Sequence, residues 1–180
     1  MRLFVGLRPP APVREQLLAL TTGVENARWQ DEEQLHVTLR FIGEVETHVA
    51  DDVALALGSI AAPGLDLRIA GVGAFHARGR AKALWAGVAP KEPLAALHRK
   101  IDQALVRTGL APEGRAYLPH ITLARLNAAA GPVEGWLAAH AGLASEPFAI
   151  GHMLLFESSL GRAGASYGAI ARYPLVPPLS

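Results

Sequence analysis

Two short segments with nearly the same pattern constrain the fold of this chain more than any other feature. They read "LHVTLRFIGEV" at residues 35–45 and "PHITLARL" at residues 119–126, and their histidines lie 84 positions apart. Both segments alternate polar with apolar residues and are rich in β-branched side chains, which is typical of a strand with one buried face. A chain that repeats such a strand in similar surroundings is expected to build two lobes that face each other across a cleft.

Each of these predicted strands has one apolar and one polar face, because successive side chains point to opposite sides. The polar faces carry His36 with Thr38, and His120 with Thr122. The apolar faces carry Val37, Leu39 and Phe41 in the first strand, and Ile121 and Leu123 in the second. An unsatisfied polar group in a buried layer costs about 1 to 3 kcal/mol. We therefore expect the polar pairs to face water or a ligand.

Helical and strand patterns follow one another irregularly along the rest of the chain. Apolar residues at helical spacing predict helices over residues 13–24, from a capping Thr47 to residue 60, over 92–109, and around 133–141. Further strands are expected at residues 2–7, 65–75, 82–90, 148–158 and 167–175, with a hairpin joined by the basic loop "HARGRAK". This order indicates an α+β fold, and no low-complexity linker divides it, so residues 1–180 are expected to form one domain of two lobes.

Composition excludes several classes of protein. With 51% hydrophobic and 18% charged residues, the chain is too apolar to be disordered, and it has no run near the roughly 18 apolar residues of a membrane span. The start "MRLFVGLRPPAP" lacks the features of a signal peptide, so a soluble, cytoplasmic protein is expected. A net charge of +1 argues against a protein that coats long nucleic acid by charge alone.

The paired histidines suit acid–base chemistry on a phosphodiester. The chain has no cysteine, so its chemistry must use oxygen, nitrogen or imidazole groups. Imidazole titrates near neutrality, so one histidine can accept a proton while the other donates one. The hydroxyls of Thr38 and Thr122 would donate hydrogen bonds to the phosphate oxygens, where negative charge builds up during the reaction. The sequence contains none of the familiar metal-ligand spacings, so we expect neither a metal nor another cofactor.

At these residues the chain resembles the two-histidine phosphoesterase superfamily, and within it the LigT-like RNA 2′,3′-cyclic phosphodiesterases. The resemblance covers nearly the whole chain. It includes "RLFVGL", "RWQDEEQLHVTLRFIGEV", "LWAGV", "RAYLPHITLAR", and "SSLGRAGASY" before "YPL". It implies a bilobal α+β fold, in which two antiparallel-sheet lobes with outer helices surround a central cleft.

The resemblance also implies a reaction and a role for each motif residue. The reaction is metal-independent hydrolysis of an RNA-terminal 2′,3′-cyclic phosphate to a 2′-phosphate. His120 would accept a proton from water, His36 would donate a proton to the leaving 3′ oxygen, and Thr38 and Thr122 would hold the phosphate. The expected partner is an RNA or nucleotide that ends in a cyclic phosphate, and we expect no membrane association and a monomeric protein.

Four further residues are candidates for the substrate site. Arg125 matches the arginine that ends the second motif of the family, yet it lies five positions from His120, which places it on the opposite face of a regular strand. A bulge after Thr122 or a side chain that reaches round the strand end would resolve this conflict, and a surface salt bridge is the alternative. Arg40 lies two positions after Thr38 and so on the same face of a regular strand, which makes it a second candidate. We nevertheless expect it to be a solvated residue at the end of the strand.

Phe4 and Tyr167 could offer ring faces on which a base stacks, although a lone aromatic residue in an apolar strand is more often part of the core. The hairpin loop with Arg78, Arg80 and Lys82 could contact RNA phosphates, although a solvated turn is the default.

Three other functions remain open at this point. The same residues could join RNA ends through a 2′,5′ linkage, or open the cyclic phosphate of a small nucleotide. A non-catalytic RNA-end binding module is the alternative from another class, and it would bind without turnover.

Overall fold

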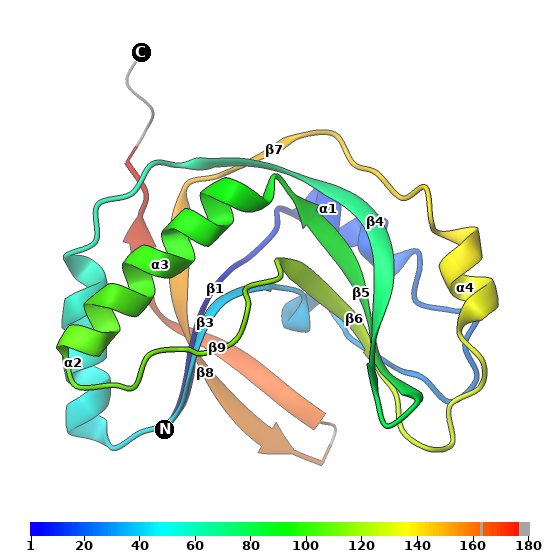
Figure 1. The fold of residues 1–180 in the computed structure, drawn as a ribbon, viewed down its shortest axis with the longest axis horizontal. Coiled ribbons are helices and arrows are strands. Elements are labelled where there is room, and N and C mark those ends of the chain that lie inside the picture. The colour runs from blue at the N-terminus through cyan, green and yellow to red at the C-terminus, as the bar shows by residue number, and fades with distance from the viewer. Residues whose placement is uncertain (163, 177–180) are drawn as a thin grey trace.

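The computed structural model of the protein describes residues 1–162 and 164–176, so Ala163 of the segment "SSLGRAGASY" and residues 177–180 lie outside the described part. The fold is α+β, as predicted: a strongly curled antiparallel sheet carries helices on its outer side (Figure 1). The strands are β1 (Arg2–Leu7), β2 (Arg28–Trp29), β3 (Val37–Glu44), β4 (Leu65–Ala77), β5 (Arg80–Ala89), β6 (His120–Arg125), β7 (Phe148–Ile150), β8 (His152–Gly161) and β9 (Gly164–Pro174). The helices are α1 (Ala11–Leu18), the 3₁₀ helix η1 (Glu32–Gln34), α2 (Thr47–Gly58), α3 (Lys91–Arg107) and α4 (Glu134–Ala139).

The sheet consists of two four-stranded halves that meet in its middle. The strand order is β7-β4-β5-β6-β3-β1-β8-β9, and the short β2 pairs with β6. Strands β3 and β6 belong to different halves, and they are joined through the pair Val37 and Ile121. The two antiparallel lobes that we predicted are therefore the halves of one continuous sheet, and the two His-x-Thr strands lie side by side at its centre.

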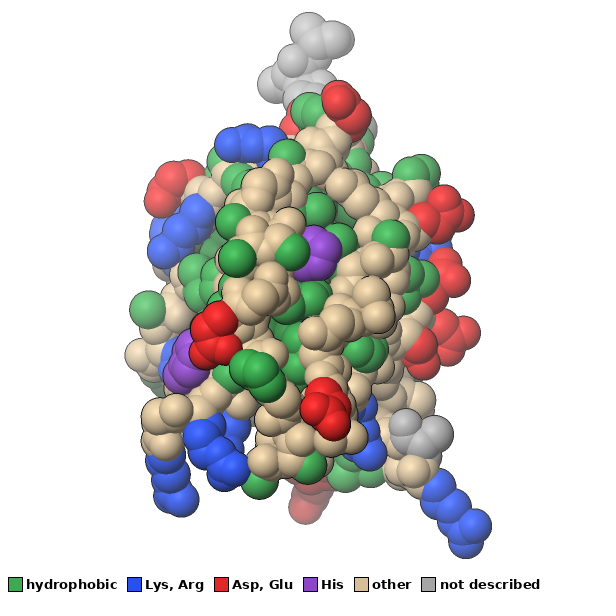
Figure 2. Space-filling view, turned by 90° about the vertical axis from the view of Figure 1, so that its right-hand side faces the viewer, with side chains coloured by type: hydrophobic (Ala, Val, Ile, Leu, Met, Phe, Trp, Pro, Cys, Tyr) green, Lys and Arg blue, Asp and Glu red, His purple; other side chains and the backbone are tan. Residues whose placement is uncertain are grey.

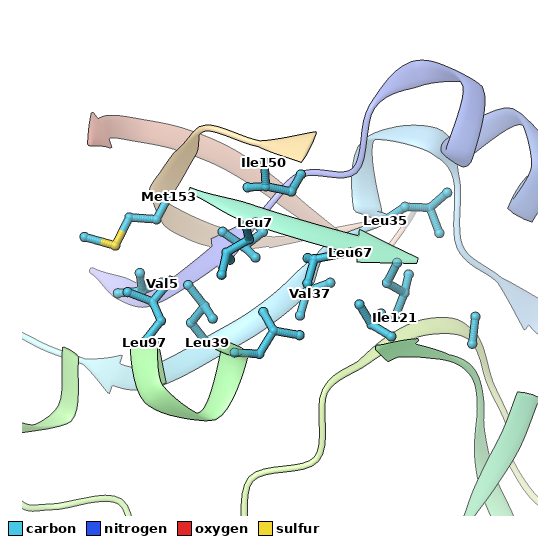
Figure 3. Packing of buried hydrophobic residues seen from close by; sticks show 14 of the residues in the cluster. Val5, Leu7, Leu35, Val37, Leu39, Leu67, Leu97, Ile121, Ile150 and Met153 are labelled. Atoms are coloured by element: carbon cyan, nitrogen blue, oxygen red, sulfur yellow. The ribbon is translucent and has the colours of Figure 1, made fainter. Parts of the chain in front are cut away.

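The apolar faces of these central strands lie in the hydrophobic core. Figure 3 shows buried side chains of several elements packed together, among them Val37, Leu39 and Ile121. These three side chains are at most 2% exposed. Full burial of a side chain of this size contributes roughly 1.5 to 3 kcal/mol. Burial therefore fixes which face of β3 and β6 points inward, and with it the direction of the polar pairs.

Strand β3 contains a bulge that changes its later residues. In the register with β1, Gly6 lies opposite Thr38 and Val5 lies opposite Arg40, so Leu39 is an extra residue. Both Leu39 and Arg40 are consequently buried, and Phe41 is 55% exposed. Two of our predictions are wrong for this reason, because Phe41 is not on the apolar face and Arg40 is not a solvated strand end.

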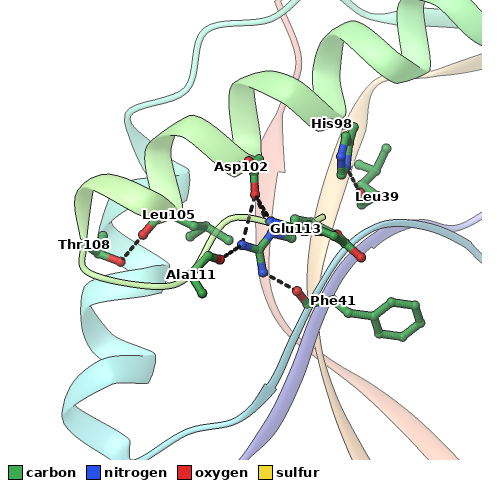
Figure 4. Close-up of polar contacts among 9 residues, drawn as sticks. Leu39, Phe41, His98, Asp102, Leu105, Thr108, Ala111 and Glu113 are labelled. Atoms are coloured by element: carbon green, nitrogen blue, oxygen red, sulfur yellow. Dashed lines mark hydrogen bonds and ion pairs between the residues drawn. The ribbon is translucent and has the colours of Figure 1, made fainter. Parts of the chain in front are cut away.

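Arg40 instead connects β3 to α3 and the chain that follows α3, and Figure 4 labels its partners Asp102, Ala111 and Glu113. Its side chain is 5% exposed, and its Nε lies 3.0 Å from a carboxylate oxygen of Asp102. Arg40 also donates to the carbonyl oxygen of Ala111 at 2.6 Å, and its Nε lies 3.8 Å from the carboxylate of Glu113. A buried cation requires such partners, and these partners lie on the side of β3 that faces away from the histidines.

Other elements also differ from the sequence prediction. The expected strand at residues 148–158 is interrupted at Gly151, where β7 ends and β8 begins. Helix α1 ends at Leu18, because the hydroxyl of Thr21 bonds to the carbonyl oxygen of Leu18 and Gly23 then takes a left-handed conformation with φ +94°. Thr47 does not cap α2: it is the first helical residue, and the preceding residue makes no side-chain capping bond. The β4–β5 hairpin turns at Arg78 and Gly79, both with positive φ, so the loop is shorter than predicted.

Candidate active site

The structure brings His36, Thr38, His120 and Thr122 together on one face of the sheet. Val37 and Ile121 form the pair that joins β3 to β6, and both point into the core. Side chains one position away therefore point to the other face. In an antiparallel register, this pairing sets His36 opposite Thr122 and Thr38 opposite His120. The two motifs thus lie crosswise, so that each histidine has its own threonine along the strand and the other motif's threonine across it.

Both histidines are held in the same tautomer by the backbone. Nδ1 of His36 lies 2.7 Å from the carbonyl oxygen of Gln34, and Nδ1 of His120 lies 2.7 Å from that of Leu118. A carbonyl oxygen only accepts, so each Nδ1 carries the hydrogen and each neutral ring keeps a free lone pair on Nε2. Nε2 of His36 lies 3.0 Å from Oγ1 of Thr38, which can donate to it. Nε2 is therefore the nitrogen that both histidines offer to a substrate.

The surroundings lower the pKa of both histidines. Burial is the main cause for His36, and the charges of His120 and Arg125 add to it, so its pKa falls to about 4 although the bond to Gln34 opposes the shift. Burial also lowers the pKa of His120, helped by the charge of Arg125 and opposed by the bond to Leu118. Both rings are therefore neutral at pH 7 in the free protein. A bound phosphate would raise both pKa values, because a nearby negative charge favours imidazolium.

Aromatic rings surround each histidine. The rings of Phe4 and Tyr167 lie 4.7 and 5.1 Å from the ring of His36, measured between centroids, and the ring of Phe75 lies 4.8 Å from that of His120. Phe4 is 3% exposed, so it packs against the buried side of His36 and leaves little ring face on which a base could stack. Tyr167 is half-buried and lines a cavity beside His36. Of the two aromatic candidates, Tyr167 keeps a position from which it can contact substrate.

Arg125 lies on the same face as Thr122, because β6 contains a bulge. In the register with β5, Thr122 lies opposite Trp85 and Ala124 lies opposite Leu84, so Leu123 is an extra residue. Leu123 and Ala124 are both buried, and Arg125 is exposed. This bulge is one of the two solutions that the sequence left open for the parity of Arg125. The positive charge of Arg125 lowers the pKa of both histidines. No described carboxylate forms an ion pair with Arg125.

The sequence interpretation missed Trp85, which lies opposite Thr122 on β5. Its ring lies 6.2 Å from that of His120, and its buried Nε1 has no hydrogen-bond partner in the described part of the chain. The sequence does not show that Gly73 on β4 packs against this ring: a Cβ atom there would lie 2.3 Å from the indole, so only glycine leaves room for it. Phe75, Phe156 and Gln34, which also contact the histidines, were missed because each looks like an ordinary strand or loop residue.

The basic hairpin turn is exposed to solvent. Figure 2 shows Lys and Arg side chains along the lower edge of one face, at the level where Figure 1 places the β4–β5 turn. Arg78 and Arg80 are exposed there, and Arg80 donates to the carbonyl oxygen of Ala128 at 3.4 Å. These contacts agree with a solvated turn.

Among the residues that the structure describes, no group of three or more His, Asp or Glu side chains lies close enough to hold a metal ion. No described helix is both long and apolar enough to cross a membrane.

Comparison with known proteins identifies the family. Residues 9–161 match the model of the 2′-5′ RNA ligase superfamily. Three curated relatives carry the name RNA 2′,3′-cyclic phosphodiesterase. The protein of Escherichia coli is 29% identical, over 97% of this chain and 96% of its own. That of Geobacillus stearothermophilus is 29% identical over 82% of this chain, and that of Aeropyrum pernix is 36% identical over 60%. The match spans about half of the Geobacillus protein and 61% of the Aeropyrum protein.

Solved structures show the same fold. A crystal structure of a Thermus thermophilus protein superimposes with a TM-score of 0.79 at 25% identity, covering 99% of this chain and 100% of that one. The E. coli LigT structure in complex with 3′-AMP gives a TM-score of 0.76 at 27% identity, covering 97% of both chains. These matches confirm the LigT-like resemblance seen in the two His-x-Thr strands, and the chain belongs to the 2′-5′ RNA ligase superfamily.

Proposed function

We propose that this protein is an RNA 2′,3′-cyclic phosphodiesterase that hydrolyses a terminal cyclic phosphate to a 2′-phosphate without a metal ion. One observation carries the proposal: His36 and His120 lie in crosswise motifs on one face of the sheet, and each keeps its hydrogen on Nδ1 and offers Nε2. Acid–base catalysis at a phosphodiester needs two such groups. Relatives over most of the chain bear the name of this activity, and E. coli LigT has been crystallised with 3′-AMP and with phosphate.

In the proposed reaction, Nε2 of His120 takes a proton from a water molecule while the water oxygen attacks the phosphorus. The bond from phosphorus to O3′ breaks, and Nε2–H of His36 gives its proton to that leaving oxygen. The phosphate remains bonded to O2′. Each such group typically contributes about 10²- to 10⁴-fold to the rate. His36 must be protonated for this step, and the negative charge of the bound phosphate favours that form.

Thr38 and Thr122 fit the role of phosphate donors. Each lies beside a histidine on the same face, and its hydroxyl adds no charge that would shift the histidine pKa values further. In the free protein the Thr38 hydroxyl is within bonding distance of Nε2 of His36. A bound phosphate would accept the hydrogen bond of the Thr38 hydroxyl in place of His36. Nε2 of His36 would then be free to carry the catalytic proton.

The decisive experiment uses a short RNA that ends in a 2′,3′-cyclic phosphate. The protein is incubated with this RNA, and the product is identified by mass and by chromatography beside synthetic RNAs that end in a 2′-phosphate or a 3′-phosphate. A 2′-phosphate is the expected product, and replacement of His36 or His120 by Ala should lower turnover at least about 10²-fold. Binding without turnover would instead identify a non-catalytic RNA-end binding module.

The family description gives ligation as the second candidate. The model that the chain matches is named for 2′-5′ RNA ligases. The same two histidines would serve ligation, in which the 5′-hydroxyl of a second RNA attacks the phosphorus in place of water and the bond to O3′ breaks. The incubation is therefore repeated with a second RNA that ends in a 5′-hydroxyl. A joined strand with a 2′,5′ linkage would support the ligase. Turnover of a nucleoside 2′,3′-cyclic phosphate alone would point to a small-nucleotide substrate.

A further inference from the structure

A cavity of about 230 Å³ lies next to His36 and is not used by the reaction itself. Its walls come from β2 and β6 on one side and from the β8–β9 hairpin on the other. Gln34, Arg125 and Tyr167 connect it to the catalytic face, because Gln34 accepts the Nδ1 hydrogen bond of His36 and the Tyr167 ring lies 5.1 Å from the ring of His36. A nucleotide whose cyclic phosphate meets the histidines would therefore extend into this cavity or pass its mouth.

Two arginines face each other at this cavity. Arg28 on β2 pairs with Arg125 on β6, so the two cationic side chains start from neighbouring backbone positions. Neither guanidinium forms an ion pair with a described carboxylate. Nη1 of Arg28 lies 3.9 Å from the place where a Cβ atom on Gly164 would be, so it reaches across to the β8–β9 hairpin. Two close cations without anionic partners favour an anionic ligand between or beside them.

A buried polar side chain also lines the cavity. Gln30 is 7% exposed, and its backbone N–H is fixed by a 2.8 Å bond to the carbonyl oxygen of Leu123. Its side-chain amide forms no hydrogen bond with the described residues, and its atoms are not among the fully buried unpaired ones, so the amide is open to the cavity. An amide offers both donors and an acceptor, so a ligand in the cavity has a bonding partner in Gln30.

We propose that this cavity binds the 5′-phosphate of the nucleotide that carries the cyclic phosphate, which in RNA is the phosphodiester link to the preceding residue. Arg28 holds this second phosphate, the Gln30 amide bonds to the same nucleotide, and Arg125 stands between the second phosphate and the reacting one. The cavity thereby distinguishes RNA ends from free nucleoside cyclic phosphates. This inference rests on the proposed function, because it assigns the second phosphate of the same substrate.

The test compares adenosine 2′,3′-cyclic phosphate with the same compound bearing a 5′-phosphate. The wild-type protein should show kcat/KM at least about tenfold higher for the 5′-phosphorylated compound, as expected when a phosphate gains a charge-assisted contact. Arg28→Ala should remove most of this preference and leave kcat/KM for the unphosphorylated compound within about twofold. Arg99→Ala, at an exposed arginine of α3, is the matched control and should keep the wild-type preference.

Two outcomes would overturn the inference: equal kcat/KM of the wild-type protein for both compounds, or an equal loss for both in Arg28→Ala. If neither compound is hydrolysed, the proposed function fails, and calorimetric titration of the two compounds then decides the inference alone. If the wild-type protein binds the 5′-phosphorylated compound more tightly than the other, and Arg28→Ala binds both equally, the cavity is still the site of the 5′-phosphate. Gln30→Leu, which keeps the volume but removes the amide, should weaken binding of both compounds.

Discussion

At the scale of single residues, the two histidines form the same hydrogen bond: each ring donates from Nδ1 to the carbonyl oxygen two positions earlier in the chain. This bond fixes the ring orientation and the tautomer before any substrate arrives. The arrangement requires burial, which lowers the pKa of both rings and brings the pKa of His36 to about 4. Two consequences of these pKa shifts can be measured.

The first consequence concerns the pH dependence of catalysis. The profile of kcat/KM reports the free protein, in which one histidine must be neutral and the other protonated, so it should be bell-shaped. Because both pKa values lie below 6.5, the maximum of kcat/KM should fall on the acid side of pH 6.5. The maximum of kcat should lie at higher pH, since bound phosphate raises both pKa values. Steady-state rates between about pH 4 and 9 check this, and a kcat/KM maximum above about pH 7 would contradict it.

The second consequence concerns stability. The folded protein keeps His36 neutral down to about pH 4, whereas the unfolded chain takes up a proton at the ordinary pKa of 6.5. Proton uptake by the unfolded chain lowers the free energy of unfolding as the pH falls from 6.5 to 4, by on the order of 3 kcal/mol for this residue. His36→Gln should lose less stability over this window. Urea unfolding at about pH 7, 5.5 and 4.5 measures the difference, and parallel losses in both proteins would refute it.

At the scale of elements, two bulges decide which side chains reach the site. The bulge in β3 sends Arg40 to α3, and the bulge in β6 brings Arg125 to the face of Thr122. Each bulge inverts the faces of the residues after it. Two substitutions test side chains at or beside these strands.

The contacts of Arg40 can be removed by Arg40→Ala. The substitution removes the Arg40 bonds to Asp102 and to the carbonyl oxygen of Ala111, while Asp102 is 21% exposed and keeps the bond from the backbone N–H of Glu113. Loss of a hydrogen-bond partner at a partly buried group costs about 1 to 3 kcal/mol, and we expect a loss of that size in the free energy of unfolding. The control is Arg68→Ala at an exposed position of β4, which should change stability by less than about 0.5 kcal/mol. Chemical denaturation compares the two variants, and equal stabilities would show that Arg40 contributes nothing.

The position of Trp85 can be shifted by Gly73→Ala. The new methyl group would lie within 2.3 Å of the indole ring, so the ring beside His120 must move. Overpacking of this kind costs typically about 1 to 3 kcal/mol, and we expect turnover to fall together with stability. Gly135→Ala serves as control, because its methyl group meets nothing within 4 Å and its helix α4 should gain up to about 1 kcal/mol. If Gly73→Ala keeps full activity, the Trp85 ring does not support His120.

At the scale of the whole molecule, the site lies where the two halves of the sheet meet. The pair Val37 and Ile121 joins the halves, and the core packs behind it. Each half supplies one histidine, one threonine and a set of aromatic rings, so neither half contains a complete site. The β8–β9 hairpin of one half and β2 with β6 of the other half enclose the neighbouring cavity. The relative position of the two His-x-Thr pairs is therefore fixed by the packing of the halves.

The molecule offers no metal-binding cluster among its described residues, and the proposed chemistry does not require one. We expect hydrolysis of a 2′,3′-cyclic phosphate to proceed unchanged, within about twofold, after incubation with EDTA and removal of the chelator-bound metal. The measurement compares treated and untreated protein on the same RNA. Loss of activity on chelation that returns with added Mg²⁺ or Zn²⁺ would reject the metal-free mechanism.

The sequence by itself determined the α+β class, the two strands and the pair of histidines, because strand periodicity and repetition are local properties of the chain. It also determined that Val37 and Ile121 point to the core and the His-x-Thr residues away from it. The tertiary structure alone decided the faces of Arg40, Phe41 and Arg125, since a bulge depends on the register with a strand distant in the sequence. It likewise decided the surroundings of Trp85 and Gln30, because the unpaired Nε1 of Trp85 and the burial of Gln30 arise only when separate elements pack together.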